Sequence, residues 1–200
     1  MKSKIRRNLG KALIIFGVVL AALAVALVLY NLYVDHKAAE GIDEIISKLS
    51  NDSEQEAQPD YILNPDMEMP IETINGVDYV GKISIPELEL ELPVISECTY
   101  PNLKIAPCRY SGSAYLDNMV IAGHNYSSFF GTLKNISTGD KIVFTDIDGN
   151  VFMYEVADMQ VLVPTDIENM IVGDWDLTLF TCTVGGRTRF AVRCDRVNVY

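Results

Sequence analysis

The chain has 200 residues, with 16 Lys or Arg against 27 Asp or Glu, and a formal net charge of −11 at pH 7. This length fits one domain with additional segments. The first eleven residues carry five positive charges (Lys2, Lys4, Arg6, Arg7 and Lys11) and no acidic residue, so the net charge of the remainder is more negative than that of the whole chain. We therefore expect no binding of nucleic acid or other anionic polymers through general electrostatics.

The N-terminal region has the pattern of a membrane anchor. Segment 1–11 is basic, and segment 12–34 contains no charged residue. At ~1.5 Å per residue the apolar segment would form a helix of roughly 34 Å, enough to span a hydrocarbon core. The positive-inside rule predicts a single-pass protein at the cell membrane, in contact with membrane lipid, with a cytoplasmic N-terminus and an extracellular remainder. A cleaved signal peptide is the alternative, but its apolar run would span about 7–15 residues.

Segment 35–76 is predicted to be an extracellular stalk and linker. Gly41–Leu49 has apolar residues at the spacing of a short amphipathic helix. Ser50–Asp60 is polar and acidic, and it lacks the apolar surface that would offset the entropy of ordering it. Tyr61–Ile74 contains two prolines and is expected to be extended. Whether it covers a cleft in the domain is left open.

Residues 77–200 are predicted to form an all-β domain. Asp146–Asn150 holds an Asp-Gly pair between two apolar runs, which is typical of a hairpin. Helical turns are expected within Thr99–Ala106 and Ser127–Ile136. Many short strands with few helices favour a closed barrel or a sandwich. The expected strands are Tyr79–Ile85, Leu90–Ile95, Asn118–Ala122, Lys141–Thr145, Val151–Val156 continued by Gln160–Val163 through a bulge, Asp176–Cys182 and Arg189–Tyr200.

A cysteine, a histidine and an arginine are candidates for acyl-transfer chemistry. Cys182 ends an apolar strand, and a thiolate nucleophile needs a neighbour that takes or shares its proton. His124 follows another apolar run and could supply general acid and base catalysis. Arg189 could bind an oxyanion, with Arg187 as its competitor. The alternatives are a packed cysteine and a solvated arginine at the edge of the sheet.

These residues lie in motifs that resemble those of the sortases, the membrane-anchored cysteine transpeptidases of Gram-positive bacteria. Thr178-Leu-Phe-Thr-Cys182 matches the T-L-x-T-C motif of that family, and Arg189-Phe-Ala-Val192 matches the strand that follows it. Ile121-Ala-Gly-His124 matches the segment around the family histidine. Gly81–Pro86 and Leu92–Val94 are similar to its first two strands. The resemblance covers residues 77–200.

The resemblance implies a closed eight-stranded sortase-type β-barrel in which Cys182 is the nucleophile, His124 the general acid and base, and Arg189 the oxyanion or substrate stabiliser. The implied reaction cleaves an LPxTG-like sorting signal between Thr and Gly through a thioester. The acyl group of the secreted protein then passes to an amine, on a peptidoglycan precursor or a pilin. The chain lacks the Asp-Pro-aromatic lid motif of pilin-polymerising sortases, which favours a class A- or D-like enzyme that anchors proteins to the cell wall.

No cofactor is expected, although four carboxylates before the cysteine strand raise calcium as an alternative. They belong to Asp166, Glu168, Asp174 and Asp176.

The cysteines allow a further prediction and a further hypothesis. Outside the cell, Cys98 and Cys108 are the cysteine pair for which a disulfide would be tested first. A third functional hypothesis is a membrane-tethered binding domain with an inert thiol.

Overall fold

The structure is a computed structural model that describes residues 2–49 and 59–197. The chain divides into two compact units, Met1–Lys37 and Ala38–Tyr200. Helix α1 (Lys2–Leu49) forms the first unit and continues into the second. Within it, Phe16–Val34 has a mean hydropathy of 2.3 and is not buried in the structure, so by length and composition this segment could cross a membrane.

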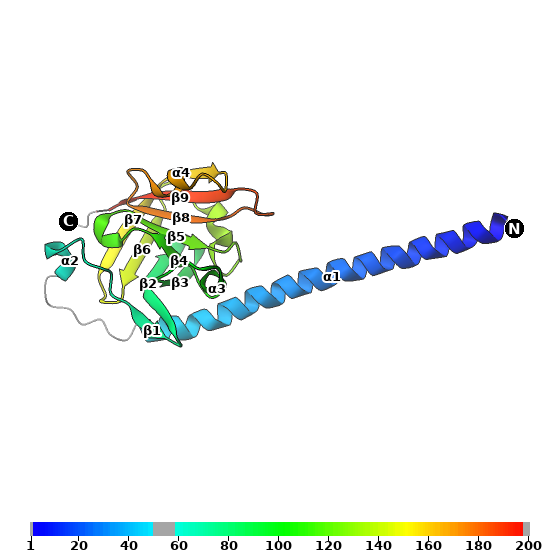
Figure 1. Cartoon of the computed structure of the whole chain (residues 1–200), viewed down its shortest axis with the longest axis horizontal. Coiled ribbons are helices and arrows are strands. Elements are labelled where there is room, and N and C mark those ends of the chain that lie inside the picture. The colour runs from blue at the N-terminus through cyan, green and yellow to red at the C-terminus, as the bar shows by residue number, and fades with distance from the viewer. Residues whose placement is uncertain (1, 50–58, 198–200) are drawn as a thin grey trace. The chain divides into compact units, whose positions relative to one another are not determined.

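The helix therefore continues past Val34 through the first part of the expected stalk (Figure 1). The linker expected at Ser50–Asp60 falls mainly on residues 50–58, which lie outside the described residues. The division of the chain after residues 11, 34 and 76 stays a prediction.

The second unit is a closed β-barrel of eight strands. Its strand order is β2-β3-β4-β5-β8-β9-β7-β6, and β2 pairs with both β3 and β6, which closes the sheet on itself. The closed eight-stranded barrel expected from the sequence is confirmed. The strands are β2 (Val77–Ile85), β3 (Leu90–Ile95), β4 (Cys108–Ser111), β5 (Met119–Gly123), β6 (Lys141–Asp146), β7 (Val151–Leu162), β8 (Leu177–Cys182) and β9 (Arg189–Arg196).

A ninth strand, β1 (Glu72–Ile74), pairs with the start of β2 in what was expected to be the stalk. Asn75 and Gly76 connect the two strands with φ values of 54° and 81°. Positive φ at both central residues is the requirement of a type I′ hairpin, which Asn-Gly satisfies at little cost. The short helices are α2 (Asp60–Leu63), η1 (Pro86–Leu88), α3 (Tyr100–Leu103), η2 (Ala114–Leu116), η3 (Phe130–Asn135) and α4 (Ile167–Ile171).

The barrel interior is filled by side chains from alternate strand positions. Phe144, Phe152 and Leu179 are fully buried in the main core, and burial of each such side chain contributes about 1.5–3 kcal/mol. β7 is long enough to pair with both β6 and β9, and its register shifts between Val156 and Asp158. The bulge expected in this strand is thereby confirmed. A bulge strengthens the local twist, which helps a sheet to close.

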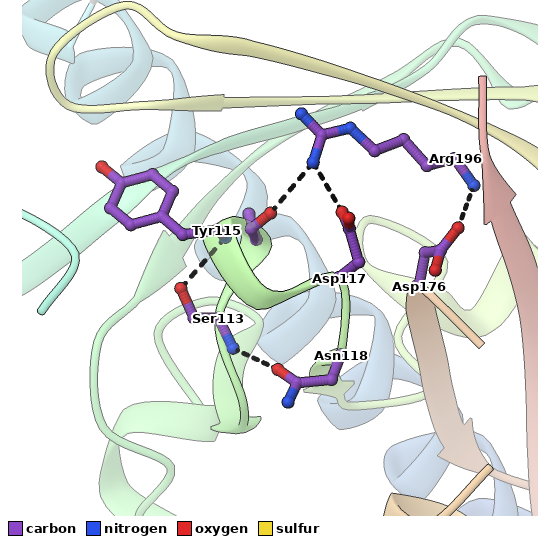
Figure 2. Close-up of polar contacts among 7 residues, drawn as sticks. Ser113, Tyr115, Asp117, Asn118, Asp176 and Arg196 are labelled. Atoms are coloured by element: carbon purple, nitrogen blue, oxygen red, sulfur yellow. Dashed lines mark hydrogen bonds and ion pairs between the residues drawn. The ribbon is translucent and has the colours of Figure 1, made fainter. Parts of the chain in front are cut away.

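Arg196 joins three segments on one side of the barrel through hydrogen bonds. Its backbone N–H donates to Asp176 (2.6 Å), and its guanidinium donates to the Ala114 carbonyl (3.4 Å) and to Asp117 (2.5 Å), as Figure 2 shows. The guanidinium also lies over the ring of Phe152, 4.8 Å from its centroid. These contacts join η2 to the start of β8 and the end of β9.

The segment that precedes the barrel packs on this same side. The ring of Tyr61 stacks on that of Tyr115, with centroids 4.6 Å apart and planes 9° from parallel. The Tyr115 hydroxyl in turn donates to the buried carboxylate of Asp146 (2.7 Å). Tyr61 therefore packs against η2, the helix that Arg196 joins to β8 and β9.

Candidate active site

Strand pairing brings the three candidate residues to one end of the barrel. β5 and β8 are parallel, and Gly123 is paired with Thr181, so His124 and Cys182 each follow directly on a paired position. β8 and β9 are antiparallel, and Cys182 is paired with Arg189. All three side chains line one cavity of about 310 Å³, which we call the outer cavity.

The cavity lies on the outside of the barrel because side chains alternate along β8. Leu177 and Leu179 point into the main core, whereas Phe180 packs in a separate cluster with Val120, Met170 and Ala191. Cys182 lies two positions after Phe180, so both side chains point to the same face of the sheet. Both line the outer cavity. The thiol is partly buried, at the last position of its strand.

Close packing after β5 holds His124 in place. A Cβ atom at Gly123 would lie 2.6 Å from the ring of Phe130, so only glycine lets that ring lie against the strand end. The backbone N–H of Phe130 donates to the carbonyl of His124 (3.1 Å). The ring of Tyr100 meets the imidazole edge-on at 6.0 Å, and that of Tyr126 lies 5.0 Å from it.

The environment of His124 favours its neutral form. Burial, with a smaller contribution from the positive charge of Lys104, lowers the pKa of the imidazole. Its Nε2 atom is buried and has no hydrogen-bond partner among the described residues. An unpaired buried polar atom costs about 1–3 kcal/mol, and a cost of this kind is typical of an atom with a functional role.

Arg189 is oriented by the turn that precedes it. Its Nη1 donates to the carbonyls of Gly186 (3.2 Å) and Thr188 (3.3 Å), while its Nε and Nη2 make no hydrogen bond to any described residue. Gly185 and Gly186 have φ values of 84° and 69°, which favour glycine. Arg187 is exposed and does not line the outer cavity.

Helix α4 forms one wall of the outer cavity, and the buried Arg193 holds this helix in place. Ile167 and Met170 of α4 line the outer cavity. Arg193 on β9 is 1% exposed, and it donates to the carbonyls of Asn169 and Met170. Sequence reasoning missed Arg193, because in an alternating strand it resembles a solvent-facing charge. The Figure 1 view places α4 alongside β8 and β9.

The four carboxylates considered for calcium do not gather around a common point. Asp166 accepts hydrogen bonds from Asn169 (2.8 and 2.9 Å), and Asp176 accepts one from the Arg196 backbone (2.6 Å). Within residues 2–49 and 59–197, no group of three or more His, Cys, Asp or Glu could hold a metal ion. The arrangement gives calcium no support, and a cofactor-free enzyme stays a prediction.

Cys98 and Cys108 lie beside each other as free thiols. A hydrogen bond between them lowers the pKa of Cys98. Cys108 is buried, whereas Cys98 lines the outer cavity. The expected disulfide therefore has its two partners side by side, and its formation stays a prediction.

Comparisons with known proteins place the chain in a family. A sequence model of the sortase domain matches residues 83–197, more than half of the chain. Sortase A of Bacillus anthracis is 31% identical over 127 residues, which cover 59% of this chain and 59% of that protein. The chain thus spans about three fifths of the length of this relative.

Solved sortase structures share the fold. Sortase C1 of Streptococcus suis is 26% identical with a TM-score of 0.54, covering 61% of this chain and 74% of that chain. Sortase C of Clostridium perfringens SM101 has a TM-score of 0.57 at 22% identity, covering 79% of this chain and 98% of that chain. Family model, sequence relative and barrel topology lead to one conclusion. The chain belongs to the sortase family.

Proposed function

We propose that the protein is a cysteine transpeptidase that cleaves an LPxTG-like sorting signal between Thr and Gly and transfers the acyl group to an amine. The observation that supports this most is the outer cavity, which His124, Cys182 and Arg189 line from three separate segments. Nucleophile, base and cation around one cavity are the components that acyl transfer requires.

Acylation begins with the thiol of Cys182. The neutral imidazole of His124 takes the thiol proton, and the sulfur attacks the carbonyl carbon of the scissile Thr–Gly bond. As the carbon–nitrogen bond breaks, the imidazolium gives its proton to the leaving glycine amine. The acyl group is then held on Cys182 as a thioester, and His124 is neutral again.

Arg189 stabilises the negative charge that develops on the carbonyl oxygen. Its Nε and Nη2 donors remain available for the substrate, because only Nη1 is engaged by the preceding turn. A donor of this kind typically contributes about 2.7–4 kcal/mol to transition-state stabilisation. The same charge could instead orient the peptide, in which case its loss would affect KM rather than kcat.

The apolar walls of the cavity suit the sorting-signal peptide. Phe180, Ile167 and Met170 offer surface to a leucine or proline side chain. Residues 59–76 contribute no side chain to the lining, so the described part of the preceding segment leaves the cavity open. An open cavity favours attachment of secreted proteins to the cell wall over pilin polymerisation, which stays the alternative.

The proposed location follows from the N-terminal helix. Phe16–Val34 would anchor the protein in the cell membrane, and the basic residues before it would stay in the cytoplasm. The barrel would then act outside the cell, where secreted proteins and peptidoglycan precursors meet. The partners are proteins with a C-terminal sorting signal, an amine acceptor and membrane lipid.

Incubation with a small library of sorting-signal peptides, followed by mass analysis of the products, tests the proposal. We expect cleavage after Thr by the wild type and none by Cys182→Ala. His124→Gln should lower kcat by about 10²–10⁴-fold, the usual range for general acid and base catalysis. The exposed Arg187→Gln serves as the control for Arg189→Gln. Retained cleavage by Cys182→Ala would contradict the proposal.

A further inference from the structure

Cys182 lies between two cavities that share no other residue. Besides the outer cavity, a second cavity of about 380 Å³, which we call the rim cavity, is lined by Cys182 together with Asn125, Lys134, Thr181, Val184 and Phe190, among others. His124 and Arg189 line only the outer cavity, while Asn125 and Phe190, their neighbours in sequence, line only the rim cavity. The thiol therefore separates two compartments.

Strand geometry explains this separation. Along β8, Leu179 and Thr181 point inward, and Phe180 and Cys182 point outward. Thr181 lines the rim cavity, which therefore opens at the end of the barrel interior, whereas Phe180 lines the outer cavity. As the last residue of the strand, Cys182 is accessible from both compartments.

A transpeptidase has to bring two reactants to one carbonyl carbon. While the acyl chain occupies one side of the thioester, the incoming amine needs a separate approach to the same atom. We propose that the rim cavity is the binding site of the amine acceptor, and that the acyl donor occupies the outer cavity. This assignment rests on the transpeptidase function proposed above.

The polar groups of the rim cavity fit an amine that carries a nearby carboxylate. Thr181 is 5% exposed, and its Oγ1 has no hydrogen-bond partner among the described residues, so this oxygen can accept from the N–H of an amine. Lys134 adds an exposed ammonium group. That charge disfavours a second ammonium nearby, which favours the nucleophilic neutral amine, and it can pair with the acceptor carboxylate.

The transfer step requires only the amine, the thioester on Cys182 and the imidazole of His124. The amine nitrogen attacks the thioester carbonyl carbon, a carbon–nitrogen bond forms, and the carbon–sulfur bond breaks. The sulfur leaves as the Cys182 thiolate. The proton lost by the amine passes to the His124 imidazole and from there to the thiolate, which restores the starting state.

Partition of the thioester between water and an amine provides the test. The full-length enzyme is supplied with an LPxTG peptide and increasing triglycine, which ends in a carboxylate, or triglycine amide, which is uncharged there. Amide product and hydrolysed product are measured by mass spectrometry. Lys134→Gln should raise the half-saturating concentration of triglycine by about 1.5–5-fold, as expected for an exposed ion pair, and that of the amide by less.

Two control variants locate the effect. Lys141→Gln removes a lysine that lines neither cavity and should behave as the wild type. Ile167→Ala alters the outer cavity and should raise the peptide KM without changing the half-saturating amine concentration. Equal values for wild type and Lys134→Gln with both amines would overturn the acceptor assignment alone. Absence of peptide cleavage by the wild type would overturn the proposed function and the acceptor assignment with it.

Discussion

Replacement of Arg193 by methionine would release the wall of the outer cavity. Arg193 is 1% exposed, and its Nη1 donates to the carbonyl of Met170 (3.1 Å) and the hydroxyl of Thr178 (2.9 Å). It also donates to Gln160 at 3.2 and 3.3 Å and to the carbonyl of Asn169. One side chain on β9 thus joins α4 to β7 and β8.

The size of the effect follows from these contacts. The acceptors on Met170 and Thr178 are buried, and each costs about 1–3 kcal/mol when left without a donor. Methionine removes the cost of burying a charge, which offsets part of this loss. We expect Arg193→Met to destabilise the barrel by about 3 kcal/mol, or about 6–12 °C in Tm. Because domains are typically stable by about 5–15 kcal/mol, the variant should still fold.

Urea unfolding of wild type, Arg193→Met and the exposed Arg187→Met measures the stability change. Hydrogen exchange over residues 163–176 and the peptide KM report on the cavity wall. We expect faster exchange and a raised KM in Arg193→Met, with Arg187→Met close to the wild type. A loss of less than about 1 kcal/mol, or unchanged exchange in this segment, would refute the reasoning.

Three other predictions concern titration and redox chemistry. Burial and the charge of Lys104 lower the pKa of His124, so below about pH 6.5 the unfolded chain gains a proton at this residue more readily than the folded barrel does. On acidification the Tm of the wild type should therefore fall by more than that of His124→Gln. Equal losses of Tm would contradict the lowered pKa. Lys104→Gln should raise the His124 pKa in an NMR titration of Cys182→Ala, and an unchanged pKa would rule out the contribution of that charge. Oxidised glutathione should join Cys98 to Cys108 and raise stability by ~2–4 kcal/mol; persistent free thiols at both positions would contradict this.

The strands nearest the candidate site could be predicted because their patterns are local. Leu177–Cys182 combines an apolar run with an abrupt end, and the bulge of β7 is indicated by the break between the two runs Val151–Val156 and Gln160–Val163. Pairing between β5 and β8 is not visible in either strand alone. The resemblance to the sortases predicted that His124 and Cys182 act in one site, and the structure supplied the pairing of their strands and its register.

Other features escaped prediction because they depend on tertiary contacts. β4 (Cys108–Ser111) is short and has one buried residue, so it lacks an alternating pattern. Arg193 is buried only because α4 covers it, and α4 lies in a segment with the composition of a connection. The rim cavity forms between the segments that follow His124 and Cys182, which are distant in sequence. The Asn75-Gly76 turn was a local signal that could have located β1.

Acid-quenched mass spectrometry of the intact enzyme with an LPxTG peptide tests the central claim most directly. The acyl group should appear on the protein during turnover, map to Cys182 after digestion, and be released by hydroxylamine as a thioester. Cys182→Ala should carry no acyl group and release no product. Turnover without an acyl-enzyme, or an acyl group mapped to Cys98 or another residue, would contradict the account.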